Sequence, residues 1–199
     1  MAMLTGFESA PPAPLVPVPP DERQVIARAQ RGDTAAFRVL VESHRARAYA
    51  LALRVLRSGA DAEEVAQDAF VKAWAALPTF RGDASFSTWL HRIVWRRALD
   101  RLAEAKARRR REEAVAADAP LRAAPEHESG GAAEPFAERL LEALSPQQRA
   151  AVVLFYFEDR SIAQAAMVMG LPENTFKTHL HRARAALREA WRQQRSEER

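Results

Sequence analysis

From Asp21 onward, apolar residues recur every three or four positions through most of the chain, and several of these runs begin at a residue suited to capping a helix. This spacing matches one face of an α-helix, whereas a half-buried strand alternates apolar and polar residues. No convincing alternation of that kind occurs anywhere in the sequence. The pattern therefore predicts an all-α protein.

Cap signals place the expected helices of the N-terminal half. Three N-caps are predicted, at Asp33, Asp61 and Ser85. The helix after Asp33 is expected to stop near Ser58–Gly59, the one after Asp61 at Pro78, and the third to run from Phe86 to about Arg111. Two apolar stripes should face a core, made of Phe37, Leu40, His44, Ala48, Leu51 and Val55, and of Ala66, Phe70, Ala73 and Leu77.

Two segments lack the helical period. Residues 1–20 hold six of the 12 prolines and almost no charge, which predicts a disordered or polyproline-like tail. Residues 112–135 are rich in Ala, Pro, Gly and Glu and carry six acids against Arg122, a net charge of −5, which predicts a flexible acidic linker. The chain thus divides into two small helical domains, residues 21–111 and residues 136–199.

Composition argues against several classes of protein. With no cysteine, a disulfide framework and a thiolate metal site are excluded. His179 and His181 are two residues apart and point in different directions on a helix, and His44 lies on an apolar stripe, so we expect no metal and no cofactor. Neither a signal peptide nor an apolar run of membrane-spanning length is present, which favours a cytoplasmic protein.

Catalytic motifs are also missing from the sequence. There is no Ser/His/Asp order, no phosphate-binding glycine loop and no metal spacing, so we expect neither an enzyme nor a small-molecule substrate.

Charge is concentrated in two blocks. Residues 91–111 carry nine Lys and Arg against two acids, and residues 174–195 carry six basic residues against Glu189. Two basic blocks separated by an acidic linker suggest two contacts with a polyanion, although solvated arginine-rich helix faces would give the same count.

The second block belongs to a predicted helix-turn-helix, residues 161–192. Ser145 with Gln148, and Ser161 with Gln164, have the spacing of capping boxes. Gly170 permits the left-handed turn that ends a short helix, and Pro172 opens the last one. On that helix Phe176, Leu180, Ala183 and Leu187 should face the core, which leaves Lys177, Thr178, His181, Arg182 and Arg188 exposed. This is the layout of a DNA-recognition helix, and also of a basic amphipathic helix packed on a neighbour.

The segment SIAQAAMVMGLPENTFKTHLHRARAALR resembles region 4.2 of the extracytoplasmic-function group of sigma-70-type factors. The segments AFRVLVESHRARAYALALRVL, DAEEVAQDAFVKAWAALPTFRGDASFSTWLHRIVWRRALDRL and LEALSPQQRAAVVLFYFED resemble regions 2.1 to 2.4 and region 4.1. The resemblance covers about residues 21–102 and 136–192 in the family's order. It implies an alternative sigma factor that binds core RNA polymerase and promoter DNA and is commonly held inactive by an anti-sigma factor.

The resemblance also implies three surfaces. The −35 element of the promoter would be contacted by Glu173, Asn174, Lys177, Thr178, His181, Arg182, Arg184 and Arg188. The −10 element would be read by Phe80 in the loop 78–85 and by His91, Arg92, Trp95, Arg96 and Arg97 on the helix that follows. Core polymerase would dock on Asp61, Glu64, Gln67, Asp68 and Val71; without the resemblance, an acidic solvent face would be the better explanation of these residues.

Three positions depart from the family pattern. Arg96 stands where an asparagine often contacts a flipped base, Phe155 stands where some members have an arginine, and Glu173–Asn174 replaces a common Val-Gly pair. The promoter sequence that this chain recognises therefore cannot be inferred from the family.

A competing interpretation is a dimeric helix-turn-helix regulator that does not associate with core polymerase. It explains the C-terminal half of the chain only.

Overall fold

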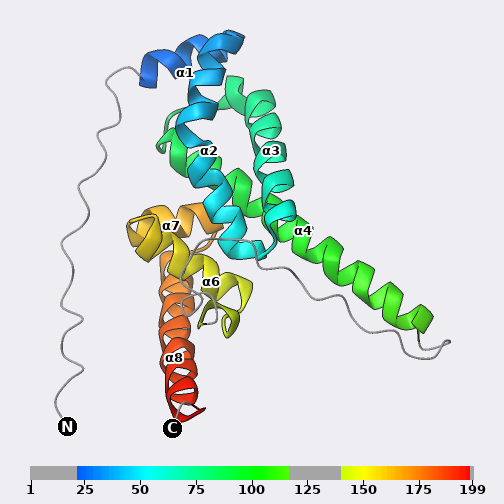
Figure 1. The fold of residues 1–199 in the computed structure, drawn as a ribbon. Helices are drawn as coiled ribbons and strands as arrows, with labels where there is room; N and C mark the ends of the chain where they lie inside the picture. Colours follow the sequence, from blue (N-terminus) through cyan, green and yellow to red (C-terminus); the bar gives the residue numbers. More distant parts are fainter. Residues whose placement is uncertain (1–21, 117–139, 198–199) are drawn as a thin grey trace.

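The computed structural model describes residues 22–116 and 140–197 (Figure 1). Its elements are α1 (Glu22–Gln30), α2 (Thr34–Leu56), α3 (Gly59–Ala76), the short 3₁₀ turn η1 (Leu77–Thr79), α4 (Phe86–Ala116), α6 (Pro146–Val152), the π-helical turn η2 (Val153–Phe157), α7 (Ile162–Met169) and α8 (Glu173–Glu197). These two ranges contain no strand, so the all-α prediction is confirmed. The tail 1–20 and residues 117–135 of the expected linker lie outside the described residues.

Helices α1 to α4 form an N-terminal lobe in which α2, α3 and the first half of α4 pack on one another (Figure 1). The predicted stripe residues of α2 and α3 are buried, except that Phe37 is half-buried. Asp33 caps α2 by accepting hydrogen bonds from the backbone N–H groups of Ala35 and Ala36. Ser85 caps α4 in the same way, through the N–H of Thr88 at 3.1 Å. Both cap predictions are confirmed.

The start of α3 differs from the prediction. Ser58, rather than Asp61, is the N-cap, and the helix begins at Gly59. The Ser58 hydroxyl accepts a hydrogen bond from the N–H of Asp61, so Asp61 lies inside the first turn. A carboxylate there still interacts favourably with the helix dipole. The preceding helix ends because Arg57 adopts a left-handed conformation with φ of 60°.

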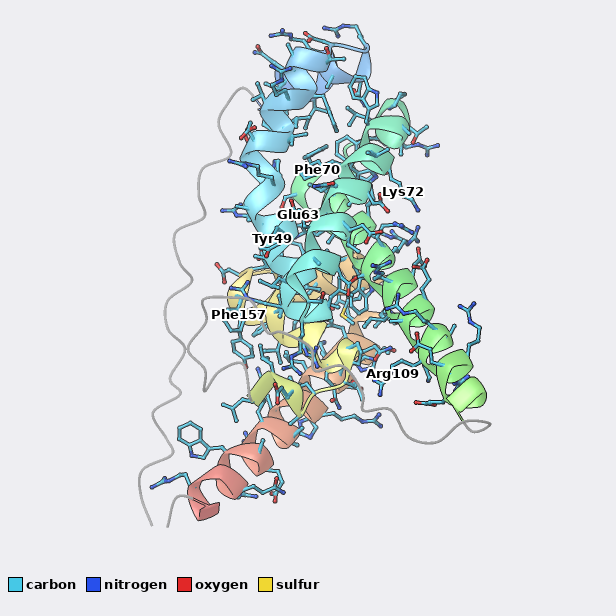
Figure 2. The ribbon with its side chains drawn as sticks, turned by 45° about the vertical axis from the view of Figure 1, so that its right-hand side comes forward. Tyr49, Glu63, Phe70, Lys72, Arg109 and Phe157 are labelled. Atoms are coloured by element: carbon cyan, nitrogen blue, oxygen red, sulfur yellow. The ribbon has the colours of Figure 1, made fainter. Side chains whose placement is uncertain are left out.

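Helix α4 is longer than expected, because it continues five residues past Arg111 to Ala116 into the start of the predicted linker. Its 31 residues span about 46 Å at 1.5 Å per residue. Only the first half packs in the lobe, and residues 103–113 are mostly exposed. The second half extends away from both lobes, with Arg109 near its free end (Figure 2).

Residues 140–197 form a C-terminal lobe built on α6, α7 and α8. Both predicted capping boxes are present, Ser145 with Gln148 and Ser161 with Gln164. Gly170 ends α7 in the left-handed conformation, with φ of 68°, and α8 starts at Glu173 immediately after Pro172. Phe176, Leu180 and Ala183 are buried against α6 and α7. The helix-turn-helix prediction is confirmed.

A π-helical turn follows α6 that the sequence pattern did not predict. The N–H of Glu158 bonds the carbonyl of Val153 at 3.0 Å, and Asp159 has a positive φ of 50°. Such a turn shifts the side chains that follow it relative to a regular α-helix. Here Arg160 ends up 9% exposed, pointing at the N-terminal lobe.

The two lobes are in direct contact, because α7 packs on α4 and α6 packs on α2 (Figure 1). Buried apolar side chains of both lobes form one continuous cluster. In the described ranges, none of the helices has an apolar stretch long enough to cross a bilayer.

Candidate nucleic-acid and protein interfaces

Helix α8 presents a basic face to solvent. Phe176, Leu180 and Ala183 anchor one side of the helix, so the side chains between them point outward. All eight residues predicted to contact the −35 element are exposed: Glu173, Asn174, Lys177, Thr178, His181, Arg182, Arg184 and Arg188. Among the described residues, Lys177, Arg182 and Arg188 have no ion pair. This face offers charged donors suited to phosphates and base edges.

Two of these residues make contacts within the lobe. Thr178 donates its hydroxyl to the carbonyl of Asn174 at 2.9 Å. Arg184 bonds the Tyr156 hydroxyl at 2.8 Å and lies over that ring, 5.6 Å from its centre. Arg184 is thereby oriented by an aromatic side chain from η2.

An aromatic cluster supports the loop between η1 and α4. The ring of Phe80 lies 5.0 Å from Trp89 and 6.1 Å from Phe86, measured between ring centres. Phe86 also contacts the His44 ring at 5.1 Å. Gln30 of α1 donates to the carbonyls of Leu77 and Phe80, which fixes the start of the loop. Residues 81–83 are exposed beyond this support.

The residues predicted to read the −10 element fall into two groups. Arg96 is exposed, whereas Phe80, Arg92 and Arg97 are half-buried. His91 and Trp95 are buried, with 0% and 3% of their surfaces exposed. In this conformation these two side chains are therefore out of reach of a base.

His91 lies in the contact between the lobes. Its Nδ1 is 3.1 Å from the guanidinium of Arg160, and burial, followed by the nearby charge of Arg160, lowers its pKa to about 3. The imidazole is therefore neutral at pH 7. Since Arg160 can only donate, Nδ1 accepts this hydrogen bond and the ring proton is on Nε2.

The outer face of α3 carries the residues predicted to bind core polymerase. Glu64, Gln67 and Val71 are exposed, and Asp61 and Asp68 are half-buried. Arginines of α4 pair with the acids: Arg97 lies 2.5 Å from Asp68, and Arg101 lies 2.6 Å from Asp61 and 2.9 Å from Glu64. Burial raises the pKa of Asp61, but hydrogen bonds from Arg101 and Ser58 outweigh it and leave that pKa below its usual value.

Beside this face, the ends of α2 and α3 form an open apolar groove that the sequence analysis did not identify. It is lined by Thr34, Phe37, Phe70, Val71 and Trp74. Val71 belongs both to the groove and to the acidic face, and 69% of its surface is exposed. The two features together form one amphipathic surface. Its only signal in the sequence is Val71, an apolar residue on the polar side of the helix.

Two buried arginines were also missed. Arg149 donates to the carbonyls of Leu141, Leu144 and Val55, and burial lowers its pKa to about 10. Arg160 bonds Ser87, Thr88 and His91 of α4. Each is a lone basic residue close to a buried apolar segment, which is the only indication the sequence offers. In the described residues, no group of three or more His, Asp or Glu side chains could hold a metal ion.

Comparison with known families matches both lobes. Residues 40–109 match the Sigma-70 region 2 model, and residues 137–187 match the Sigma-70, region 4 model. The RNA polymerase sigma-H factor of Pseudomonas aeruginosa is 34% identical over 179 residues, covering 85% of this chain and 93% of that protein. The chain belongs to the extracytoplasmic-function group of sigma-70-type sigma factors.

Other relatives of this sigma factor agree in length and fold. The ECF RNA polymerase sigma-E factor of Escherichia coli K12 is 33% identical over 181 residues, covering 83% of this chain and 92% of that protein. The solved structure of CnrH in complex with the cytosolic domain of CnrY is 29% identical, with a TM-score of 0.59, and covers 84% of this chain and 95% of that chain. The sigma factor therefore matches these relatives over both of its lobes, with region 2 in α2 to α4 and region 4 in the C-terminal lobe.

Proposed function

We propose that this alternative sigma factor binds core RNA polymerase through the outer face of α3 and directs it to promoters through α8 and α4. The observation that carries the proposal is the combination of two basic helices, one in each lobe, with one acidic and apolar surface on α3, which precedes both of them in the sequence. A regulator with a single DNA-binding helix would need only the C-terminal lobe.

The −35 element is assigned to the exposed face of α8. Lys177 and Arg182 are about one turn apart and lie in the N-terminal half of α8. This is the part of a recognition helix that enters the major groove. Arg188 lies farther along, where backbone phosphates are within reach. Glu173 at the helix start is suited to accept from cytosine N4 or to stabilise the helix N-terminus.

The −10 element is assigned to the loop 80–85 and the exposed side of α4. Phe80 supplies an aromatic ring, Arg96 an exposed guanidinium, and the basic second half of α4 a row of charges for phosphates. His91 takes part only if the C-terminal lobe moves, because Arg160 of that lobe covers it, and Trp95 is buried in this conformation.

Core polymerase is assigned to the amphipathic surface of α3. A basic helix with an apolar stripe fits its acids together with Val71 and the groove. An anti-sigma factor would occupy the same surface and so compete with polymerase. In this proposal the catalytic centre belongs to the polymerase, and the sigma factor acts in the cytoplasm without catalytic activity of its own.

The decisive experiment is transcription in vitro on a fragmented genomic library, with core polymerase alone and with the protein added, followed by mapping of transcript starts. Specific initiation that depends on the protein is expected. Initiation no higher than that of core polymerase alone would refute the proposal. Co-purification in a fixed stoichiometry with core polymerase separates it from the dimeric regulator.

Variants then test each surface. Lys177→Ala and Arg182→Ala should each weaken binding to a recovered promoter by about 1–3 kcal/mol, or lower the salt dependence by about one unit if they contact phosphates. Arg195→Ala, at the far end of the same helix, is the matched control.

Val71→Glu should weaken polymerase binding without affecting binding to duplex DNA. Arg38→Ala, at an exposed position of α2, is its control.

A further inference from the structure

Helix α1 packs against the start of the loop 80–85, which links η1 to α4. Gln30, the last residue of α1, is half-buried and places its side-chain amide between two backbone carbonyls. Its Nε2 lies 3.2 Å from the carbonyl oxygen of Leu77 and 2.8 Å from that of Phe80. An amide nitrogen carries two N–H groups, so both donors of Gln30 hold this one turn.

The two carbonyls lie where a helix ends and the chain changes direction. Leu77 follows α3, and the last carbonyls of a helix lack intrahelical partners, while Pro78 after it has no N–H group. The N–H of Phe80 bonds the carbonyl of Leu77 at 3.0 Å, and the backbone then becomes extended at Phe80, with ψ of 115°. Gln30 therefore supplies donors from another element at the point where the loop begins.

The far end of the loop is fixed as well. Ser85 caps α4, and Phe86, the first residue of that helix, is buried. The ring of Phe86 lies 5.1 Å from that of His44, measured between ring centres. His44 Nε2 in turn lies 2.7 Å from the carboxylate of Glu22, the first residue of α1. The two ends of α1 thus support the two ends of the loop, Gln30 directly and Glu22 through His44.

Four residues, 81–84, remain between these fixed ends. Residues 81–83 are exposed, and Gly82 adopts a left-handed conformation with φ of 79°. A short loop with both ends held has few conformations, so it loses little entropy when it binds a partner. This matters for an unpaired base, because the unstacking of that base already opposes binding.

We propose that Gln30 is a positioning residue for promoter opening, which holds the loop 80–85 in the conformation that receives an unpaired base of the −10 element. Gln30 itself does not contact DNA. Its amide acts through the carbonyl of Phe80, the residue that supplies the aromatic ring of the loop. The consequence for promoters rests on the proposed function, whereas the effect of Gln30 on the order of the loop does not.

Two variants separate the hydrogen bonds of Gln30 from the packing of its side chain. Gln30→Glu keeps nearly the same size and helix propensity, but its carboxylate has no donor and would face two carbonyl oxygens. Gln30→Ala removes the donors without adding a negative charge near the C-terminus of α1. Gln24→Glu is the matched control, because Gln24 is exposed on the same helix and the change of charge is the same.

Loop order can be measured in the free full-length protein, without polymerase or DNA. Hydrogen exchange of the Phe80 amide, followed by NMR, reports on the turn that Gln30 holds. Gln30→Glu and Gln30→Ala should each raise this exchange rate about tenfold, since two neutral hydrogen bonds together contribute about that factor. Gln24→Glu should leave the rate unchanged. The amide of Ala73, which is buried on α3, should exchange at the wild-type rate in all three variants.

Opening is tested on one recovered promoter in two forms, one fully paired and one mismatched in advance across the −10 element. Holoenzyme that carries Gln30→Glu or Gln30→Ala should initiate about tenfold less on the paired form, because a less ordered loop captures the unpaired base less well. On the mismatched form initiation should stay within about twofold of wild type, because the bases are already unstacked there. Binding to duplex DNA of the −35 element should not change.

The outcomes separate this inference from the proposed function. No change in the exchange of Phe80, or an equal rise at Ala73, would overturn the positioning role of Gln30. An equal loss on both promoter forms would overturn it too, because Gln30 would then affect a step other than opening. If the wild-type holoenzyme supports no initiation at all, the proposed function fails, while the exchange measurement still decides whether Gln30 orders the loop.

Discussion

Helices α4 and α8 are the two basic helices of this sigma factor, and they differ in how their charges are used. On α4, Arg97 and Arg101 pair with acids of α3, and His91 is covered by the other lobe. On α8, Lys177 and Arg182 are exposed and have no ion pair among the described residues. The same composition therefore yields internal contacts on the first half of α4 and a solvent-facing surface on α8, while the second half of α4 is exposed as well. Basic residue counts cannot distinguish the two.

The comparison predicts that substitutions at the paired or buried positions in the first half of α4 change stability, whereas those on the outer face of α8 change binding only. The first prediction concerns a feature that the lobes share, a fully buried phenylalanine in each. Phe86→Ala and Phe176→Ala should each cost about 3–5 kcal/mol, because both leave a cavity in a packed core. Thermal or urea unfolding measures the loss. A small cost at Phe176 alone would show that the C-terminal lobe is loosely packed.

The second prediction concerns Arg149, which bonds the carbonyl of Val55 near the end of α2. Arg149→Met should cost about 2 kcal/mol, because it removes hydrogen bonds from a charged donor to three carbonyls, one of them in the other lobe. Unfolding of the two lobes should also become less coincident when the helical signal, which reports on both lobes, is compared with tryptophan fluorescence, since three of the four tryptophans (Trp74, Trp89 and Trp95) lie in the N-terminal lobe. Arg38→Met on the exposed side of α2 is the control. Equal effects of the two substitutions would contradict a bridging role for Arg149.

The third prediction concerns pH. The pKa of His91 is about 3 in the folded protein against an ordinary value of 6.5, so only the unfolded state takes up a proton between those values. The contribution of His91 to stability is complete above pH 6.5 and is lost as the pH falls toward 3. The slope is about 1.4 kcal/mol per pH unit once well below 6.5. His91→Gln should reduce the loss of stability between pH 7.5 and 5.5, measured by urea unfolding. An identical pH dependence in the variant and the wild type would show that His91 is accessible.

The smallest effects concern the surface charges. Arg101→Gln should cost about 0.5–1 kcal/mol, since its carboxylate partners are partly exposed and such pairs contribute little. Arg188→Gln on α8 should change stability by no more than about 0.5 kcal/mol. Melting temperatures of the two variants measured side by side test this. A larger cost for Arg188 than for Arg101 would reverse the comparison between the helices.

Much of the local structure was predictable from the sequence because it depends on neighbours three or four residues away. Asp33, Ser145 and Ser161 cap their helices as expected, and Gly170 adopts the left-handed conformation that its position required. Where the prediction at Asp61 was wrong, the competing cap lay only three residues upstream, at Ser58. The exposed face of α8 was predictable in the same way, because the 3.6-residue helical period determines which side chains lie opposite the buried ones.

The tertiary structure alone decided which of the predicted residues are accessible. His91 and Arg96 lie on the same helix, α4, and both were predicted to read the −10 element. Arg96 is exposed, whereas His91 is covered by Arg160, which is 69 positions away in the sequence. Arg149 likewise finds Val55 across 94 positions. No periodicity records such contacts, because they arise only once two finished helices meet. The sequence by itself thus determined the helices and the family of this sigma factor, and the packing between its lobes decided which of its surfaces are free.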